Sequence, residues 1–358
     1  MINVTYFTGA GASYHSIPLI KTMNKRMKAF SQFLKDQKES GKLTHDFAEK
    51  FINELDELIE IEKNRTSIDA YARELELSGS VKKLLHLKTI LTSYLIFEQL
   101  NKPKDLVLNS GDYNYKGIPK SPIPLDTEYQ EMIKVPIDKR YITFWGEHLK
   151  PNNDKLSNNI KVLSWNYDMQ FEFSYSQIKK FSLELTQQNL QVFPSVLKDI
   201  DIKQSCILKL NGTAGLLYDN HTKTKLFNLF DYREHSLMEN LDYLIEPFKV
   251  NFDRAYIEPL LTFAWESKTL VFNTRKYAKE IIQDTDILVI IGYSFPRFNQ
   301  DVDREIFKEV PKLKKIYYQA KEDELPELIE KLDGINSKMA SITKGVKNLD
   351  TFYYPSEL

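Results

Sequence analysis

The spacing of apolar residues divides the chain into a helical first part and a second part in which short strands alternate with helices. An apolar, β-prone run at residues 4–8 predicts a strand. The following stretch contains only two glycines, Gly41 and Gly79, both at expected helix boundaries. Within it, apolar residues recur three and four positions apart, which predicts helices at 19–36, 44–62, 67–77 and 80–101. A mostly helical block is therefore expected to be inserted after the first strand.

Residues 102–125 are rich in proline and glycine and are expected to be a loop. The region 128–149 predicts one more helix. Its aromatic residues Tyr141, Phe144 and Trp145 are interpreted as packing residues rather than as part of a cofactor site.

The second half predicts an α/β sheet. Short β-prone runs lie at 160–165, 204–210, 286–291 and 314–319, and helical patterns lie at 168–180, 274–284, 300–309 and 323–333. Residues 213–230 are expected to form a hairpin with its turn at Asp219-Asn220. This alternation predicts a doubly wound, mostly parallel Rossmann-like sheet. The expected organisation is a core of residues 1–18 and 155–358 with an inserted helical subdomain at 19–150.

Composition limits the possible classes of protein. The chain has 358 residues, a formal net charge of −1 and a single cysteine, Cys206. The near-zero charge gives no electrostatic argument for direct nucleic-acid recognition. One cysteine excludes intramolecular disulfides and a cysteine-rich zinc site, so no metal is expected. No signal segment and no apolar run long enough to span a membrane is recognised, so a soluble, cytoplasmic protein is expected.

The first strand ends in the turn Gly9-Ala10-Gly11-Ala12-Ser13. Two glycines allow a sharp bend and a close approach of the backbone to a ligand. The exposed amides at the start of the next helix then favour a phosphate. The motif lacks the third glycine of the dinucleotide fingerprint, because position 14 is Tyr14. Taken alone, it is equally compatible with a tight turn that binds nothing.

Polar residues also follow the other predicted strands. The segments are Trp165–Asp168, Asn211–Thr213, Gly292–Pro296 and Tyr318–Ala320. Each has a structural alternative, since asparagine and aspartate cap helices and Asn-Gly forms turns. Ligands of open α/β sheets bind outside the carboxyl ends of the strands, so the four segments together with the glycine turn predict a ligand site there.

These ordered motifs, G-A-G-A-S, W-N-Y-D, L-N-G-T and I-G-Y-S-F, resemble those of the sirtuin-like superfamily. The resemblance implies an NAD site. It places the pyrophosphate on Gly9, Ala10, Gly11 and Ser13, and the nicotinamide ribose and reactive water near Asn166 and Asp168. It places the adenosine half on Gly292, Tyr293 and Ser294, with Gln319 near the adenine ribose.

The chain departs from deacetylating sirtuins in two ways. It lacks the four cysteines of their zinc ribbon, and its segment Ser16–Ile20 keeps only the proline of theirs. Both differences argue against removal of acyl groups from lysine. They favour the similar bacterial branch that breaks down NAD in antiphage defence.

Asn211 stands where the family has a histidine, and an amide cannot accept a proton near neutral pH. His15 and His221 are alternative bases, although structural or surface roles fit both. The expected function is an NAD glycohydrolase, in which Asn166, Asp168 and Asn211 act on NAD. The alternative is an NAD- or ADP-ribose-binding sensor or scaffold without turnover.

The resemblance also implies partners: a homo-oligomer, joined in some systems to a ring-forming DNA-translocating ATPase or a nucleic-acid-guided partner. The amphipathic helices of the insertion could serve as a docking surface or simply complete their own core.

Overall fold

The computed structural model describes residues 2–64, 67–100, 137–149, 154–195, 199–219, 224–228, 241–253, 257–266 and 269–358. The loop expected at 102–125, the first part of the helix expected from 128, and His221 lie outside these ranges. The chain forms two compact units. The sheet unit comprises Met1–Tyr14, Ile137–Thr213 and Thr262–Leu358, and the helical unit comprises His15–Pro136 and Ala214–Leu261.

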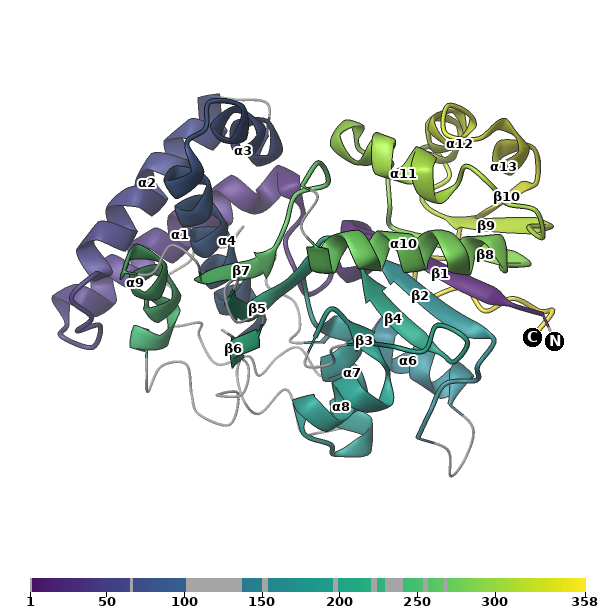
Figure 1. The fold of residues 1–358 in the computed structure, drawn as a ribbon, viewed down its shortest axis with the longest axis horizontal. Helices are drawn as coiled ribbons and strands as arrows, with labels where there is room; N and C mark the ends of the chain where they lie inside the picture. The colour runs from purple at the N-terminus through teal and green to yellow at the C-terminus, as the bar shows by residue number, and fades with distance from the viewer. Residues whose placement is uncertain are drawn as a thin grey trace. The chain divides into compact units, whose positions relative to one another are not determined.

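The sheet unit contains a seven-stranded sheet with the order β10-β9-β8-β1-β2-β4-β3 (Figure 1). Its strands are β1 Val4–Thr8, β2 Ile160–Ser164, β3 Val192–Phe193, β4 Cys206–Lys209, β8 Ile287–Ile291, β9 Lys315–Gln319 and β10 Thr343–Val346. All neighbouring strands of this sheet pair in parallel. The structure therefore confirms the predicted α/β class and Rossmann-like sheet.

The strand order places β1 at the centre of the sheet. The chain extends the sheet first on the β2 side of β1 and later on the β8 side. The order therefore reverses between β1 and β8, which is the switch point where open α/β sheets bind ligands.

Helices cover both faces of the sheet. Successive side chains of a strand point to opposite faces, so an apolar strand buries side chains on both sides. Tyr6 packs on the face covered by α6 Lys139–His148 and α7 Gln170–Lys179. Phe7 packs on the opposite face, which carries α10 Thr269–Gln283, α11 Gln300–Ile306, α12 Leu325–Asp333 and α13 Ser337–Ser341. The remaining elements are α8 Leu183–Asn189 and the short 3-10 turns η1 Ala10–Ser13 and η7 Arg297–Asn299. The three aromatic residues expected to pack, Tyr141, Phe144 and Trp145, are buried on α6.

The helical unit contains the four helices predicted from the first part of the chain. They are α1 Ile20–Glu39, α2 Ala48–Asn64, α3 Ile68–Leu77 and α4 Val81–Leu100. Residues 85–94 of α4 are all buried, as expected of a helix enclosed on every side. Aromatic contacts of Phe30 with Phe51, Tyr94 and Phe97 join α1, α2 and α4.

A later segment of the chain completes the helical unit. It comprises β5 Gly212–Asp219, β6 Thr224–Asn228, η6 Leu241–Leu244, α9 Glu246–Asp253 and β7 Ile257–Leu261. Strands β5 and β6 pair antiparallel, as the expected hairpin requires. The unit thus includes 214–261, and α6, within the expected insertion 19–150, belongs to the sheet unit. Among the described residues, no helix is long and apolar enough to cross a membrane.

Candidate functional site

The last row of the sheet before the loops is buried, and all but one of its side chains are polar. Thr8 lies in register with Ser164 on one side and with Ile291 on the other. The same row continues to Lys209 on β4 and to Gln319 on β9. All five side chains are buried. Parallel strands in register end at the same level, so the loops that follow them leave the sheet side by side.

The glycine turns after β1 and β8 pack backbone against backbone. A Cβ on Gly11 would lie 2.7 Å from the Gly292 Cα, and one on Gly9 would lie 2.8 Å from the Gly292 carbonyl oxygen. Gly292 has a φ of +59°, and a Cβ there would lie 2.2 Å from the Ala12 nitrogen. All three positions therefore require glycine, because no side chain fits between the two turns.

Much of the hydrogen-bonding capacity of the first turn is used within the protein. The amide of Gly9 donates to the Ile291 carbonyl, that of Gly11 to the Gly292 carbonyl, and that of Ala12 to the Gly9 carbonyl. The turn closes as η1, and the next α-helix, α1, belongs to the helical unit. The expected amides of a following α-helix are thus replaced by a short 3-10 turn, whose exposed residue is Ala10.

Asn166 links the loop after β2 to the glycine turn. Its Nδ2 donates to the Gly9 carbonyl at 3.0 Å and to Ser13 Oγ at 3.2 Å. Ser13 Oγ in turn lies 2.7 Å from the hydroxyl of Tyr141, whose pKa is raised by burial. A backbone carbonyl can only accept, so the NH₂ group of Asn166 faces Gly9 and Oδ1 remains as an acceptor.

Asp168 lies at the start of α7. Its Oδ1 accepts a hydrogen bond from the Gln170 amide at 3.1 Å, and its carbonyl accepts one from the Lys209 ammonium. Lys209 Nζ also lies 3.3 Å from Glu172 Oε2, and both of these side chains are fully buried. Burial raises the pKa of Glu172, and the neighbouring ammonium opposes that rise.

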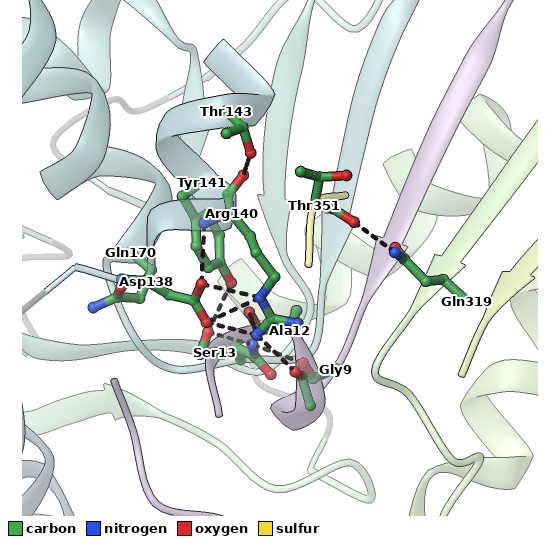
Figure 2. A network of polar contacts seen from close by, with 12 residues as sticks. Gly9, Ala12, Ser13, Asp138, Arg140, Tyr141, Thr143, Gln170, Gln319 and Thr351 are labelled. Carbon is green, nitrogen blue, oxygen red and sulfur yellow. Dashed lines mark hydrogen bonds and ion pairs between the residues drawn. The ribbon is translucent and has the colours of Figure 1, made fainter. Parts of the chain in front are cut away.

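Arg140 holds the inner side of the glycine turn (Figure 2). Its guanidinium donates to the carbonyls of Ala12 at 2.9 Å and Gly11 at 3.2 Å. It also pairs with Asp138, whose backbone amide donates to the Gln170 side chain at 2.8 Å. Arg140 and Asp138 are both buried. This network connects the turn after β1 to the start of α7 and fixes which side of the turn faces outward.

Asn211 follows β4 and is 6% exposed. Its Oδ1 accepts a hydrogen bond from Arg275 at 3.1 Å, and its Nδ2 lies 3.4 Å from the hydroxyl of Tyr167. That hydroxyl donates to the Thr262 carbonyl at 2.7 Å. Asn211 is therefore held by α10 on one side and by the loop after β2 on the other.

The segment after β8 points two aromatic side chains, Tyr293 and Phe295, into the core. Tyr293 is 5% exposed, and its hydroxyl donates to Asp303 Oδ2 at 2.6 Å. Trp165 Nε1 donates to Asp303 Oδ1 at 3.2 Å. Burial raises the pKa of Asp303 to about 8. Of this segment, Ser294 is exposed and Gly292 half-buried, so these two residues face the surface.

Gln319 is bonded to the C-terminal segment. Its Nε2 donates to the carbonyls of Thr351, at 2.6 Å, and Asn348, and its Oε1 accepts from the Tyr353 amide at 3.2 Å. Figure 2 shows Gln319 and Thr351 apart from the Arg140 network. The structure therefore brings Gly9, Gly11, Ser13, Asn166 and Gly292 into direct contact with one another. Gln319 instead binds the C-terminal segment.

Sequence reasoning missed several charged residues that support the site: Asp138, Arg140, Glu172, Lys209, Arg275 and Asp303. Only Lys209 carried a signal, as a charged residue at the end of an otherwise apolar strand. Of the alternative bases, His15 belongs to the helical unit. Cys206 is buried, and burial raises its thiol pKa to about 12, which disfavours thiolate chemistry. Within the described ranges, no group of three or more His, Cys, Asp or Glu side chains could hold a metal ion.

The fold and the polar strand ends define a Rossmann-like α/β protein with a candidate site at the switch point of its sheet. No protein-family model matches the chain. No curated protein matches it in sequence.

Proposed function

We propose that this chain is a sirtuin-like NAD glycohydrolase that converts NAD and water into ADP-ribose and nicotinamide. One observation carries the proposal: Asn166, after β2, donates to the Gly9 carbonyl of the turn after β1 and thereby keeps Oδ1 as an acceptor. An acceptor beside a glycine turn, at the switch point of a parallel sheet, suits a water or ribose hydroxyl next to a bound dinucleotide.

In this reaction the bond between C1′ of the ribose and the nicotinamide nitrogen breaks. The electron pair moves to the pyridinium nitrogen, so neutral nicotinamide leaves without protonation. Water adds to the oxocarbenium-like C1′ and releases its proton to solvent. Asn166 Oδ1 would orient that water, and the Asp168 carboxylate would stabilise the developing positive charge.

The pyrophosphate would lie against the outer surface of the glycine turn, at Ala10 and Gly11. Arg140 draws the carbonyls of Gly11 and Ala12 inward, which keeps acceptor oxygens away from an anionic ligand. The adenosine half would contact the exposed side of Gly292 and Ser294.

Asn211 favours a second candidate function, the binding of NAD or ADP-ribose without turnover. General-base assistance typically contributes about 10²–10⁴-fold to a rate, and an amide supplies none of it. A slow hydrolase and a nucleotide sensor therefore differ here in rate rather than in the residues that bind.

The decisive experiment follows nicotinamide release from NAD by the full chain and by its Asn166→Ala variant. We expect the rate to fall by about 10²-fold, because displacing the attacking water by about 1 Å lowers the rate by about that factor. Asn159→Ala is the matched control: this buried asparagine precedes β2, and its Nδ2 donates to the Ile2 carbonyl at 2.8 Å. The control should retain the wild-type rate.

Two results would count against hydrolysis. One is NAD left intact by the wild type even when its genomic neighbour and an activator are supplied. The other is an Asn166→Ala variant that is as fast as the wild type. Calorimetry that detects tight ADP-ribose binding without nicotinamide release would instead support the sensor.

We further propose that depletion of NAD by this chain serves antiphage defence within a larger assembly, as the resemblance implies. Light scattering after size-exclusion chromatography tests the assembly, and a monomer at all concentrations, with and without the neighbouring gene product, would contradict it.

A further inference from the structure

A chain of hydrogen bonds with one possible direction runs through Asn211. It starts at the Arg275 guanidinium, passes through Oδ1 and Nδ2 of Asn211 to the Tyr167 hydroxyl, and ends at the Thr262 carbonyl. A guanidinium can only donate and a backbone carbonyl can only accept. The two ends therefore fix the amide of Asn211, with Oδ1 toward Arg275 and the NH₂ group on the other side.

Arg275 is itself held in place. Its guanidinium donates to the backbone carbonyls of Glu266 at 2.8 Å and Phe263 at 3.2 Å. Burial lowers the pKa of Arg275, but a guanidinium stays protonated in proteins. The partner of Asn211 Oδ1 is thus a permanent donor at any pH where the protein is folded.

The main chain of Asn211 is fixed as well. Its carbonyl accepts hydrogen bonds from the amide and the hydroxyl of Thr262, at 2.9 Å and 3.1 Å. The side chain therefore has little freedom to turn its oxygen toward a ligand. Asn166 has the opposite polarity, because its NH₂ group is used by Gly9 and Ser13.

We propose that Arg275 is a positioning residue that makes Asn211 a hydrogen-bond donor to a ribose hydroxyl of the bound nucleotide. The NH₂ group carries two protons; one lies toward Tyr167, and the other binds the hydroxyl oxygen. This inference rests on the proposed function, since it takes the ligand to be an ADP-ribosyl group. Asn166 as acceptor and Asn211 as donor then match the two hydrogen-bonding roles of hydroxyl groups.

The same geometry specifies what a histidine at this position would do. A neutral imidazole has one donor and one acceptor nitrogen. Beside the permanent donor Arg275, its acceptor nitrogen would face the guanidinium and its N–H would face the ligand. An Asn211→His variant should therefore bind like the wild type and acquire no general base.

The test combines ADP-ribose affinity, measured by calorimetry, with the urea midpoint of unfolding. Asn211→Asp keeps an oxygen for Arg275 but removes the donor. We expect an unfolding midpoint at or above that of the wild type and an affinity lower by about tenfold or more. The affinity of Asn211→His should stay within about threefold of that of the wild type, because the imidazole N–H keeps the hydrogen bond to the ligand.

Arg275 is tested by two substitutions. Arg275→Lys can still only donate and should largely keep the affinity, whereas Arg275→Gln can donate or accept and should lower it. A merely structural role of Arg275 predicts that affinity follows stability in both variants, and that result overturns the proposal.

Two further results would also overturn it. If Asn211→Asp binds ADP-ribose as tightly as the wild type, Asn211 is no donor to the ligand. If Asn211→Asp unfolds as easily as Asn211→Ala, Arg275 does not hold Oδ1. Failure of the proposed function is distinguishable, because it appears in the wild type as an absence of nicotinamide release, whereas the tests of Asn211 and Arg275 compare the ADP-ribose affinity of variants with that of the wild type.

Discussion

Asp303 is a buried carboxyl group whose ionisation is altered by its surroundings. It is buried beneath Trp165 and Tyr293, and burial raises its pKa from 3.8 to about 8. A carboxyl group with a raised pKa keeps its proton in the folded state at pH values where the unfolded chain has released it. Its contribution to stability is therefore complete below about pH 4 and is lost as the pH rises toward 8.

The Asp303→Asn variant should remove this pH dependence. An amide resembles the protonated carboxyl, so the free energy of unfolding should no longer fall between pH 5 and pH 8. The wild type should lose up to about 1.4 kcal/mol per pH unit over that interval relative to the variant. Urea unfolding at several pH values measures the two slopes.

Asp301→Asn is the control for this comparison, because Asp301 lies on the same helix and its side chain is 99% exposed. Its slope should match that of the wild type. Equal slopes for all three proteins would show that Asp303 is ionised in the folded state throughout this range.

At the scale of elements, the pair Lys209–Glu172 connects the end of β4 to α7. Both side chains are fully buried at a separation of 3.3 Å. Removing one partner of such a pair leaves an uncompensated charge in the interior, whereas replacing both partners with apolar groups is often neutral.

Lys209→Met should therefore destabilise the protein by about 3–5 kcal/mol, and the double variant Lys209→Met/Glu172→Met should recover most of that loss. Without the ammonium, the pKa of Glu172 should rise further. The loss of stability caused by Lys209→Met should then be larger at pH 8 than at pH 5, because the Glu172 carboxyl is protonated and uncharged at the lower pH. Urea unfolding of both variants at both pH values tests this; a double variant no more stable than the single one would contradict it.

At the scale of the whole molecule, the candidate site brings together four segments that are far apart in the chain: residues 9–13, 165–168, 211–213 and 291–295. A ligand that binds only the folded state stabilises that state by mass action, by about 2.7 kcal/mol at a hundred times its Kd, and it also opposes local openings that would break its contacts. ADP-ribose should therefore slow amide hydrogen exchange in these four segments together.

Mass spectrometry of peptides after exchange, with and without ADP-ribose, measures that protection. AMP serves as the control ligand, because it lacks the second ribose and should leave 165–168 and 211–213 unprotected. Protection confined to α1–α4 of the helical unit would place the nucleotide elsewhere and contradict the proposed site.

Local sequence patterns determined most of the elements of this protein. The strands β1, β2, β4, β8 and β9 and the helices α1 to α4 lie within a few residues of their predicted positions. Their apolar residues have the period of one secondary structure over a sufficient length, and that period needs no tertiary context. The strands β3, β7 and β10 escaped prediction. Strand β3 has only two residues, β7 Ile257–Leu261 is a short apolar run with a proline inside it, and β10 is the polar sequence Thr343–Val346 at the sheet edge.

The glycine turn at 9–13 and the asparagines at 166 and 211 were also identified from the sequence, because they follow predicted strands. Only the tertiary structure decided how they are oriented. The direction of each amide depends on partners 64 to 157 positions away, Arg275 for Asn211 and Gly9 for Asn166. Such partners leave no periodic signal in a single chain, so the polarity of the site follows from the strand order and the packing of the sheet.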